Sequence, residues 1–153
     1  MLFDGYRLDL SNVKLVFCDF DDTLCIHLHN NVTRPTESQW KALRKSVGKD
    51  LYTKCLGGLC VPNELLHKWL ISYVKSTEKY LISWTEMSVI GAKLHFVEEN
   101  YADVPFAGAI RVDNREDKVK VIRCIASERG LSLDEVLLIE DHPCTLTEAQ
   151  TAG

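Results

Sequence analysis

A short apolar segment that is followed at once by acidic residues constrains the fold most. Residues 13–18 are rich in strand-forming side chains, and only Lys14 among them is polar. Such a run predicts a strand that is covered on both faces, as in a parallel sheet. Three carboxylates then follow within four positions, at Asp19, Asp21 and Asp22. Acids after a strand are usually a solvated turn or a helix N-terminus, so further residues must decide whether they form a site.

Strand and helix signals alternate along the rest of the chain. Further strands are predicted at residues 79–83, 107–112 and 135–141. Helices are predicted after Pro35 and Asn114, over residues 90–101, and from Pro62, which is expected to open its helix. In the helix after Pro62, one apolar face is expected from the following residues: Leu65, Leu66, Trp69, Leu70, Tyr73 and Val74.

This alternation favours an α/β fold, a three-layer αβα sandwich with a Rossmann-like parallel sheet. The chain has 153 residues, so a single domain over residues 1–153 is expected. The weakly patterned region at about residues 25–61 is the one candidate for an insertion, as a flap or a small helical insert. Residues 25–33 could form a small hairpin around Asn30 and Asn31.

Composition narrows the choice of partners and compartment. The net charge is -4 and no basic block is present, so charge gives no indication of nucleic-acid binding. No apolar run approaches the roughly 20 residues needed to span a bilayer, and the N-terminus does not look like a signal peptide. Of the six cysteines, Cys18 and Cys124 lie in apolar-periodic segments and are expected to be buried thiols. We therefore expect a reducing, cytoplasmic environment.

Several polar side chains follow the ends of predicted strands. Asp19 and Asp21 follow the first strand, Ser83 follows the second, and Glu140 and Asp141 end the fourth. In open parallel sheets, ligands bind beyond the carboxyl ends of the strands, so these groups can converge on one rim. Four carboxylates would repel one another there, and a hard cation such as Mg²⁺ would relieve that repulsion. The sequence therefore predicts an Mg²⁺ site from the four acids.

The same residues have the chemistry for phosphoryl transfer. Asp19 can attack phosphorus as a nucleophile, because carboxylates form covalent aspartyl-phosphates. Asp21 can protonate the leaving oxygen. The hydroxyl of Ser83 and the ammonium of Lys118 can bind the phosphate oxygens. Lys120 is a neighbouring competitor for the role of Lys118.

Four segments resemble, in order, the four signatures of the haloacid dehalogenase-like (HAD) hydrolase superfamily. DFDDTL, at Asp19 to Leu24, resembles the first signature, Asp-x-Asp-x-Thr after a buried strand. YLIS, which ends at Ser83, is similar to the second, and Lys118 to the third. LLIED, which ends at Asp141, is similar to the fourth. The resemblance covers roughly residues 13–153.

The resemblance implies a role for each matching residue. Asp19 would be the nucleophile and a metal ligand, and Asp21 the general acid/base that also binds metal through its backbone carbonyl. Thr23 would orient Asp21. Asp141 would be a metal ligand, and Glu140 would either bind the metal directly or support another ligand. In this superfamily an Asp at position 21 accompanies phosphatases and phosphomutases, so we expect a Mg²⁺-dependent phosphatase.

The lengths of the segments between motifs bear on the substrate, and two further features depart from the family pattern. The segments between Thr23 and Ser83, and between Ser83 and Lys118, are short, so only a small cap is expected. In the family, an open site goes with macromolecular substrates or with closure by another subunit. The substrate could therefore be a phosphorylated small molecule or a phosphorylated macromolecule. A homo-oligomer whose second subunit closes the site is also open. A family core would continue beyond Gly153, so the C-terminal edge is expected to be incomplete, and His142 stands where small residues are common.

Other interpretations stay open at this point. The chain could be a catalytically silent interaction module that keeps the fold. A phosphomutase is less favoured, because it normally needs a closing cap. A receiver-type signalling domain also has clustered acids, but it lacks an acidic pair so late in the chain. A zinc site would need ligands whose spacing does not match the usual pattern: Cys25, His27, His29, Cys55 and Cys60.

Overall fold

The computed structural model describes residues 2–3, 6–7, 9–27, 38 and 60–153. The predicted hairpin around Asn30 and the predicted helix after Pro35 lie outside these residues. The zinc hypothesis also depends on side chains outside them. Among the residues that are described, no helix is long and apolar enough to cross a membrane.

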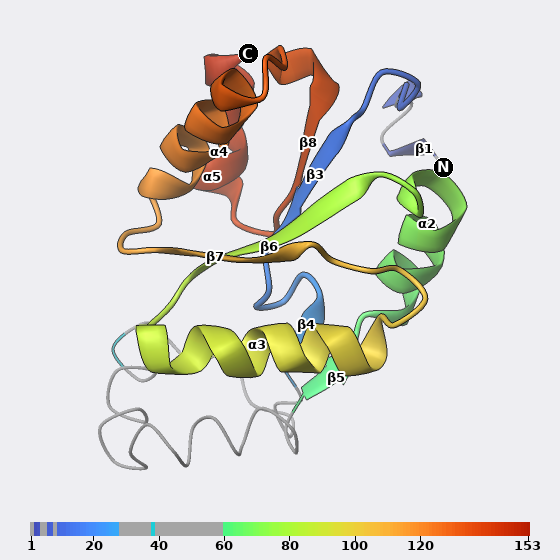
Figure 1. The fold of residues 1–153 in the computed structure, drawn as a ribbon, viewed down its shortest axis with the longest axis vertical. Helices are drawn as coiled ribbons and strands as arrows, with labels where there is room; N and C mark the ends of the chain where they lie inside the picture. Colours follow the sequence, from blue (N-terminus) through green and yellow to red (C-terminus); the bar gives the residue numbers. More distant parts are fainter. Residues whose placement is uncertain (1, 4–5, 8, 28–37, 39–59) are drawn as a thin grey trace.

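A four-stranded parallel sheet forms the centre of the molecule (Figure 1). The strand order is β7-β6-β3-β8. Strand β3 therefore has a parallel neighbour on each side: its Leu15 lies opposite Glu78 of β6 and opposite Val136 of β8. All four carboxyl ends meet at one edge as a result. The bounds are Leu15–Cys18 for β3, Glu78–Trp84 for β6, Gly108–Val112 for β7 and Val136–Ile139 for β8.

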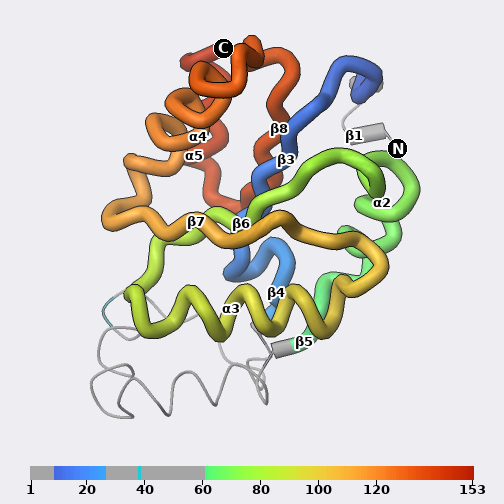
Figure 2. The backbone as a smooth tube through the Cα atoms, viewed as in Figure 1, coloured from blue at the N-terminus to red at the C-terminus, as the bar shows by residue number. Residues whose placement is uncertain are grey.

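Helices cover both faces of this sheet (Figures 1 and 2). On one face, α2 (Glu64–Val74) and α3 (Met87–Asn100) pack against the strands. On the other face lies α4 (Asp117–Glu128), and α5 (Pro143–Ala152) packs against α4. The predicted three-layer αβα sandwich with a Rossmann-like sheet is confirmed.

The alternation of side chains along β3 explains its unbroken apolar sequence. Val16 and Cys18 point into the core shared with α2 and α3, whereas Leu15 and Phe17 point into the core shared with α4. All four side chains are completely buried. Because successive residues of a strand point to opposite faces, and β3 lies between two helical layers, apolar residues are favoured at each of its positions.

Short antiparallel ladders complete the described part. Strands β1 (Leu2–Phe3) and β2 (Tyr6–Arg7) pair near the N-terminus. Strand β4 (Cys25–His27) pairs with β5 (Cys60–Pro62), so the two ends of the predicted insertion lie side by side. A single 3₁₀ turn, η1 (Leu133–Glu135), leads into β8.

Two details of the expected helix α2 were wrong. Pro62 closes β5, and the helix begins at Glu64 because the side chain of Asn63 caps it by accepting a bond from Leu66 N (3.1 Å). The expected apolar face is also too broad. Leu70 and Val74 are buried, but Leu65 is 73% exposed and Tyr73 is 54% exposed. Leu65 and Tyr73 belong to a neighbouring stripe of the helix that is turned away from the core.

The cysteine expectation was correct for Cys18 and wrong for Cys124. Cys18 is completely buried, and this burial raises the pKa of its thiol well above the ordinary value. Cys124 is exposed, because it lies two positions after the buried Ile122 and so on the outer side of α4. Among the cysteines whose side chains are described, Cys18, Cys124 and Cys144 are free thiols.

Candidate active site

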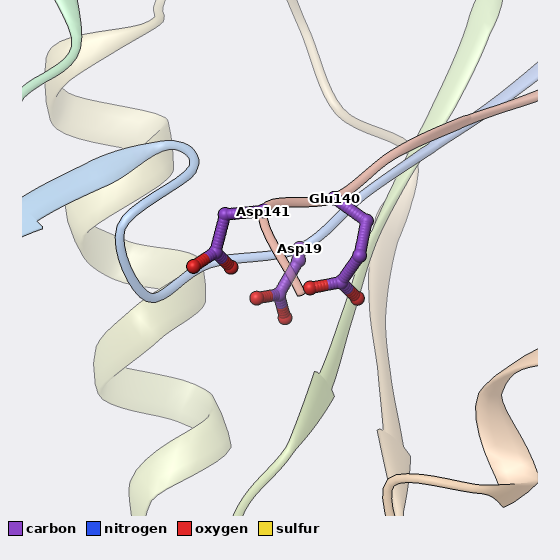
Figure 3. A group of neighbouring side chains, drawn as sticks. All are labelled: Asp19, Glu140 and Asp141. Carbon is purple, nitrogen blue, oxygen red and sulfur yellow. The ribbon is translucent and has the colours of Figure 1, made fainter. Parts of the chain in front are cut away.

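The ends of the two central strands bring three carboxylates together. Asp19 follows β3 and its backbone N–H donates to the carbonyl of Ile139 (2.9 Å), the last residue of β8. This bond continues the strand pairing by one step and sets Asp19 beside Glu140 and Asp141. Figure 3 shows the three side chains turned toward one another. One carboxylate oxygen of each lies within 4.8 Å of the others.

Such a donor set fits a hard divalent cation. Mg²⁺ prefers oxygen ligands, and it is bound in proteins through a few carboxylates, with waters and substrate phosphate completing the shell. Asp19 is buried and Asp141 is half-buried, so an ion there would be held at the rim of the sheet. Three of the four acids predicted to bind Mg²⁺ therefore lie together in space, and the carboxylate of Asp21 is not in this group.

Lys118 lies between two of these acids. Its Nζ donates to Asp19 Oδ1 (2.6 Å) and to Glu140 Oε2 (2.7 Å). The three side chains are only 4%, 9% and 1% exposed. The other oxygen of Glu140 accepts the backbone N–H of His142 (3.1 Å). Because both oxygens of Glu140 already have donors, the geometry favours Glu140 as a support for Lys118 over Glu140 as a direct metal ligand.

Burial and neighbouring charges together set the electrostatics of the site. Burial raises the pKa of Asp19 to about 7; Glu140 and Asp21 add to the increase, and Lys118 opposes it. For Lys118, burial alone would lower the pKa, but the carboxylates of Asp19 and Glu140 outweigh burial and raise it. The site therefore keeps its ammonium charged and still has more carboxylates than one ammonium can neutralise, a balance that a divalent cation would correct.

A tight loop follows Asp19 and presents Asp21. The backbone N–H of Cys25 donates to the carbonyl of Phe20 (2.9 Å), and that of Asp22 donates to the carbonyl of Cys25 (2.8 Å). Asp22 has a positive φ of 56°, in the left-handed region that Asp tolerates better than most residues. Thr23 is buried, and its hydroxyl has no hydrogen-bond partner among the described residues, so its orienting role stays a prediction.

The sequence reasoning missed a second buried ammonium at this site. Lys93, on α3, donates to Asp21 Oδ2 (2.5 Å) and to Ser83 Oγ (3.0 Å). It thus joins two predicted site residues that are on different elements. A signal was present: on α3, Lys93 shares the inward stripe with Val89, Phe96 and Val97. A lysine in the apolar stripe of a helix needs polar partners for its ammonium, and here they are Asp21 and Ser83 of the site.

Comparison with known proteins places the fold. No model of a protein family matches the chain, and no curated protein matches it. Among solved structures, the chain is similar to a predicted HAD-like family hydrolase from Porphyromonas gingivalis, with 15% identity, a TM-score of 0.57 and coverage of 94% of this chain and 89% of that one. A HAD-superfamily hydrolase of subfamily IA from Geobacter sulfurreducens matches with 14% identity, a TM-score of 0.56 and coverage of 93% and 84%.

A third structure is a HAD family enzyme from Bacteroides thetaiotaomicron, in complex with magnesium and inorganic phosphate. It shares 12% identity, with a TM-score of 0.56 and coverage of 92% of this chain and 91% of that one. The chain thus has the fold of the HAD-like hydrolase superfamily. The fold that the four sequence motifs imply is thereby confirmed.

Proposed function

We propose that the protein is a Mg²⁺-dependent phosphatase that hydrolyses phosphoric monoesters through an aspartyl-phosphate on Asp19. One observation carries the proposal: Asp19, bonded to the buried ammonium of Lys118, lies together with Glu140 and Asp141 in a group of acids that suits Mg²⁺. The fold adds support, since a neighbour of the same fold binds magnesium and inorganic phosphate. The substrate class is a phosphorylated small molecule or macromolecule.

In the first step, a carboxylate oxygen of Asp19 attacks phosphorus and forms the acyl phosphate. The bond from phosphorus to the ester oxygen breaks, its electron pair stays on that oxygen, and Asp21 donates a proton to it. Ser83 and Lys118 bind oxygens of the phosphoryl group while it moves. Mg²⁺ held by Asp19 and Asp141 would neutralise charge on the phosphoryl oxygens.

The second step returns the site to its starting state. Asp21, now a carboxylate, accepts a proton from water as that water attacks phosphorus. The bond between phosphorus and the Asp19 oxygen breaks, and inorganic phosphate leaves. Asp21 therefore serves as acid in one step and as base in the other, which requires its carboxyl group to stay close to Asp19 throughout.

The experiment is hydrolysis of p-nitrophenyl phosphate by the wild type and by Asp19→Asn, with and without Mg²⁺. Lys120→Met is the control. Lys120 is an exposed lysine of α4, the helix that carries Lys118, and its ammonium pairs with Asp117 (3.2 Å). We expect Mg²⁺-dependent turnover in the wild type and the control, with a loss of orders of magnitude in Asp19→Asn. A folded wild type that turns over neither aryl nor alkyl phosphates would contradict the proposal and would favour a silent binding module.

A further inference from the structure

Lys93 is among the most thoroughly buried charged groups of the described residues. Its side chain is 2% exposed, and its ammonium lies 5.0 Å from the centre of the Phe20 ring, next to the two oxygens that it bonds. Phe20 is in turn packed edge-on against Phe96, whose centroid is 5.5 Å away. The ammonium is thereby confined by one carboxylate, one hydroxyl and one aromatic face.

We propose that Lys93 is a positioning residue of the phosphoryl site. It holds the carboxyl group of Asp21 where a leaving-group oxygen would be protonated, and it fixes the hydroxyl of Ser83 where a phosphoryl oxygen would bind. Helix α3 thereby becomes part of the site. The inference rests on the proposed function, and it adds a residue that none of the four motifs contains.

The cost of burying Lys93 argues against a purely structural role. A buried ammonium loses its hydration, and an apolar side chain of similar length at this core position would avoid that cost. Asp21 does not need the ion pair, because its side chain is 35% exposed and can be hydrated. The bond between them therefore secures the direction of the Asp21 carboxylate more than it satisfies a buried charge.

Loop geometry makes such a restraint useful. Asp21 lies in the tight turn after β3, where a side chain could otherwise adopt several rotamers. Ser83 lies in β6, a different strand, and its hydroxyl rotates freely until a partner fixes it. One ammonium bonded to both sets their relative positions. A displacement of about 1 Å in a catalytic group can cost roughly a hundredfold in rate.

Two substrates with different leaving groups distinguish positioning of Asp21 from a general loss of structure. Nitrophenolate leaves with little need of a proton, whereas phenolate depends more on general acid catalysis. We expect Lys93→Met to lower kcat/KM for phenyl phosphate by about a hundredfold and for p-nitrophenyl phosphate by a clearly smaller factor. The decrease in kcat/KM that both substrates share reports the loss of positioning at Ser83. Lys93→Arg, which keeps the cation, should recover part of the loss.

The Asp21→Asn background and the Lys120→Met control complete the design. Without the Asp21 carboxyl group, Lys93→Met should lower kcat/KM for both substrates by the same factor. Lys120→Met should leave both values unchanged. Wild-type kcat/KM in Lys93→Met, or equal losses for the two substrates in the wild-type background, would overturn the proposal. Should Lys93→Met fail to fold, Lys93→Gln, which keeps a donor but not the charge, is subject to the same two criteria.

Crystal structures separate this proposal from the proposed function. If the wild type proves inactive, the phosphatase proposal fails, and the positioning role is decided by where the side chains lie. In a structure of Lys93→Met, we expect the Asp21 carboxylate and the Ser83 hydroxyl to leave the positions they hold in the wild type. If both keep those positions without the ammonium, Lys93 does not position them, whatever the activity.

Discussion

The ammonium of Lys118 lies 2.6 Å from a carboxylate oxygen of Asp19, although 99 positions separate the two residues along the chain. The parallel sheet accounts for this contact, because β3 and α4 approach the same edge from different layers. Both side chains are nearly inaccessible to solvent. The pair is therefore both part of the candidate site and part of the packed interior.

Replacement of Lys118 should reduce stability as well as activity. Lys118→Met leaves the buried carboxylates of Asp19 and Glu140 without their cation, and breaking a buried ion pair from one side costs about 3–5 kcal/mol. Urea denaturation in the absence of Mg²⁺ measures this loss. The exposed Lys120→Met should stay within about 0.5 kcal/mol of the wild type. Equal stability of the two variants would show that Lys118 is not the buried partner described above.

Mg²⁺ binding should depend on Asp141. A ligand that binds only the folded state raises the melting temperature by mass action, so Mg²⁺ should stabilise the wild type in a concentration-dependent way. Asp141→Asn should need a much higher Mg²⁺ concentration for the same shift, measured by thermal unfolding at increasing MgCl₂. Asp113→Asn is the control, because Asp113 is a 75% exposed carboxylate paired with Arg111. An Asp141→Asn response that matches the wild type would exclude Asp141 as a ligand.

Tyr101 should anchor the chain on both sides of the predicted insertion. Its hydroxyl donates to the carbonyl of Leu24 (2.6 Å) and accepts the backbone N–H of Asn63 (3.0 Å). Tyr101→Phe leaves both groups without this partner, which should cost about 1–3 kcal/mol of unfolding free energy. Tyr73→Phe, at a 54% exposed position, should cost almost nothing. Chemical denaturation compares the two, and the prediction fails if their losses are alike.

Acid should weaken the contact between η1 and the start of β3. Bonds from Lys14, then from Ser132, lower the pKa of Glu135 from 4.5 to about 2. A lowered folded-state pKa stabilises the protein above the unfolded-state pKa, so this contribution is present above about pH 4.5 and is lost as the pH falls toward 2. Glu135→Gln should be less stable than the wild type at pH 6, and the difference should shrink toward pH 2. A difference that is constant over this range would contradict the assignment.

Most of the fold could be predicted from local patterns. The run ending at Cys18 was found because all four residues of β3 are apolar and buried. The strand ending at Ser83 was found from its apolar centre, Tyr80 to Ile82. Helix α5 was not predicted, although Pro143 at its first turn is a typical start signal. Its ten residues carry a short and weak apolar pattern, with only Thr145 buried, so periodicity gave little to detect.

The site could be predicted where residue type and spacing define it, as at Asp19 and Asp141. Lys118 was found through its motif, but two buried lysines outside the motifs, Lys93 and Lys79, were missed, because a lysine in the sequence is taken as exposed. Lys93 and Asp21 lie 72 positions apart in the sequence, and only the folded chain brings them together. Lys79, in β6, is likewise buried, and its ammonium donates to the carbonyls of Val74 (2.6 Å), Lys75 (2.9 Å) and Thr77 (2.5 Å), where it caps the C-terminus of α2. The helical stripe of α3 could have marked Lys93 as buried, but no spacing in the sequence names the partners of either lysine.

The central claim is that Asp19 carries the phosphoryl group during turnover. Acid quenching within the first turnovers, with p-nitrophenyl phosphate and Mg²⁺, followed by mass spectrometry of proteolytic peptides, tests it most directly. We predict one added phosphoryl group on the peptide that contains Asp19, which hydroxylamine removes and which is absent from Asp19→Asn. Turnover by the wild type with no phosphorylated peptide, or with the group on another residue, would contradict the account.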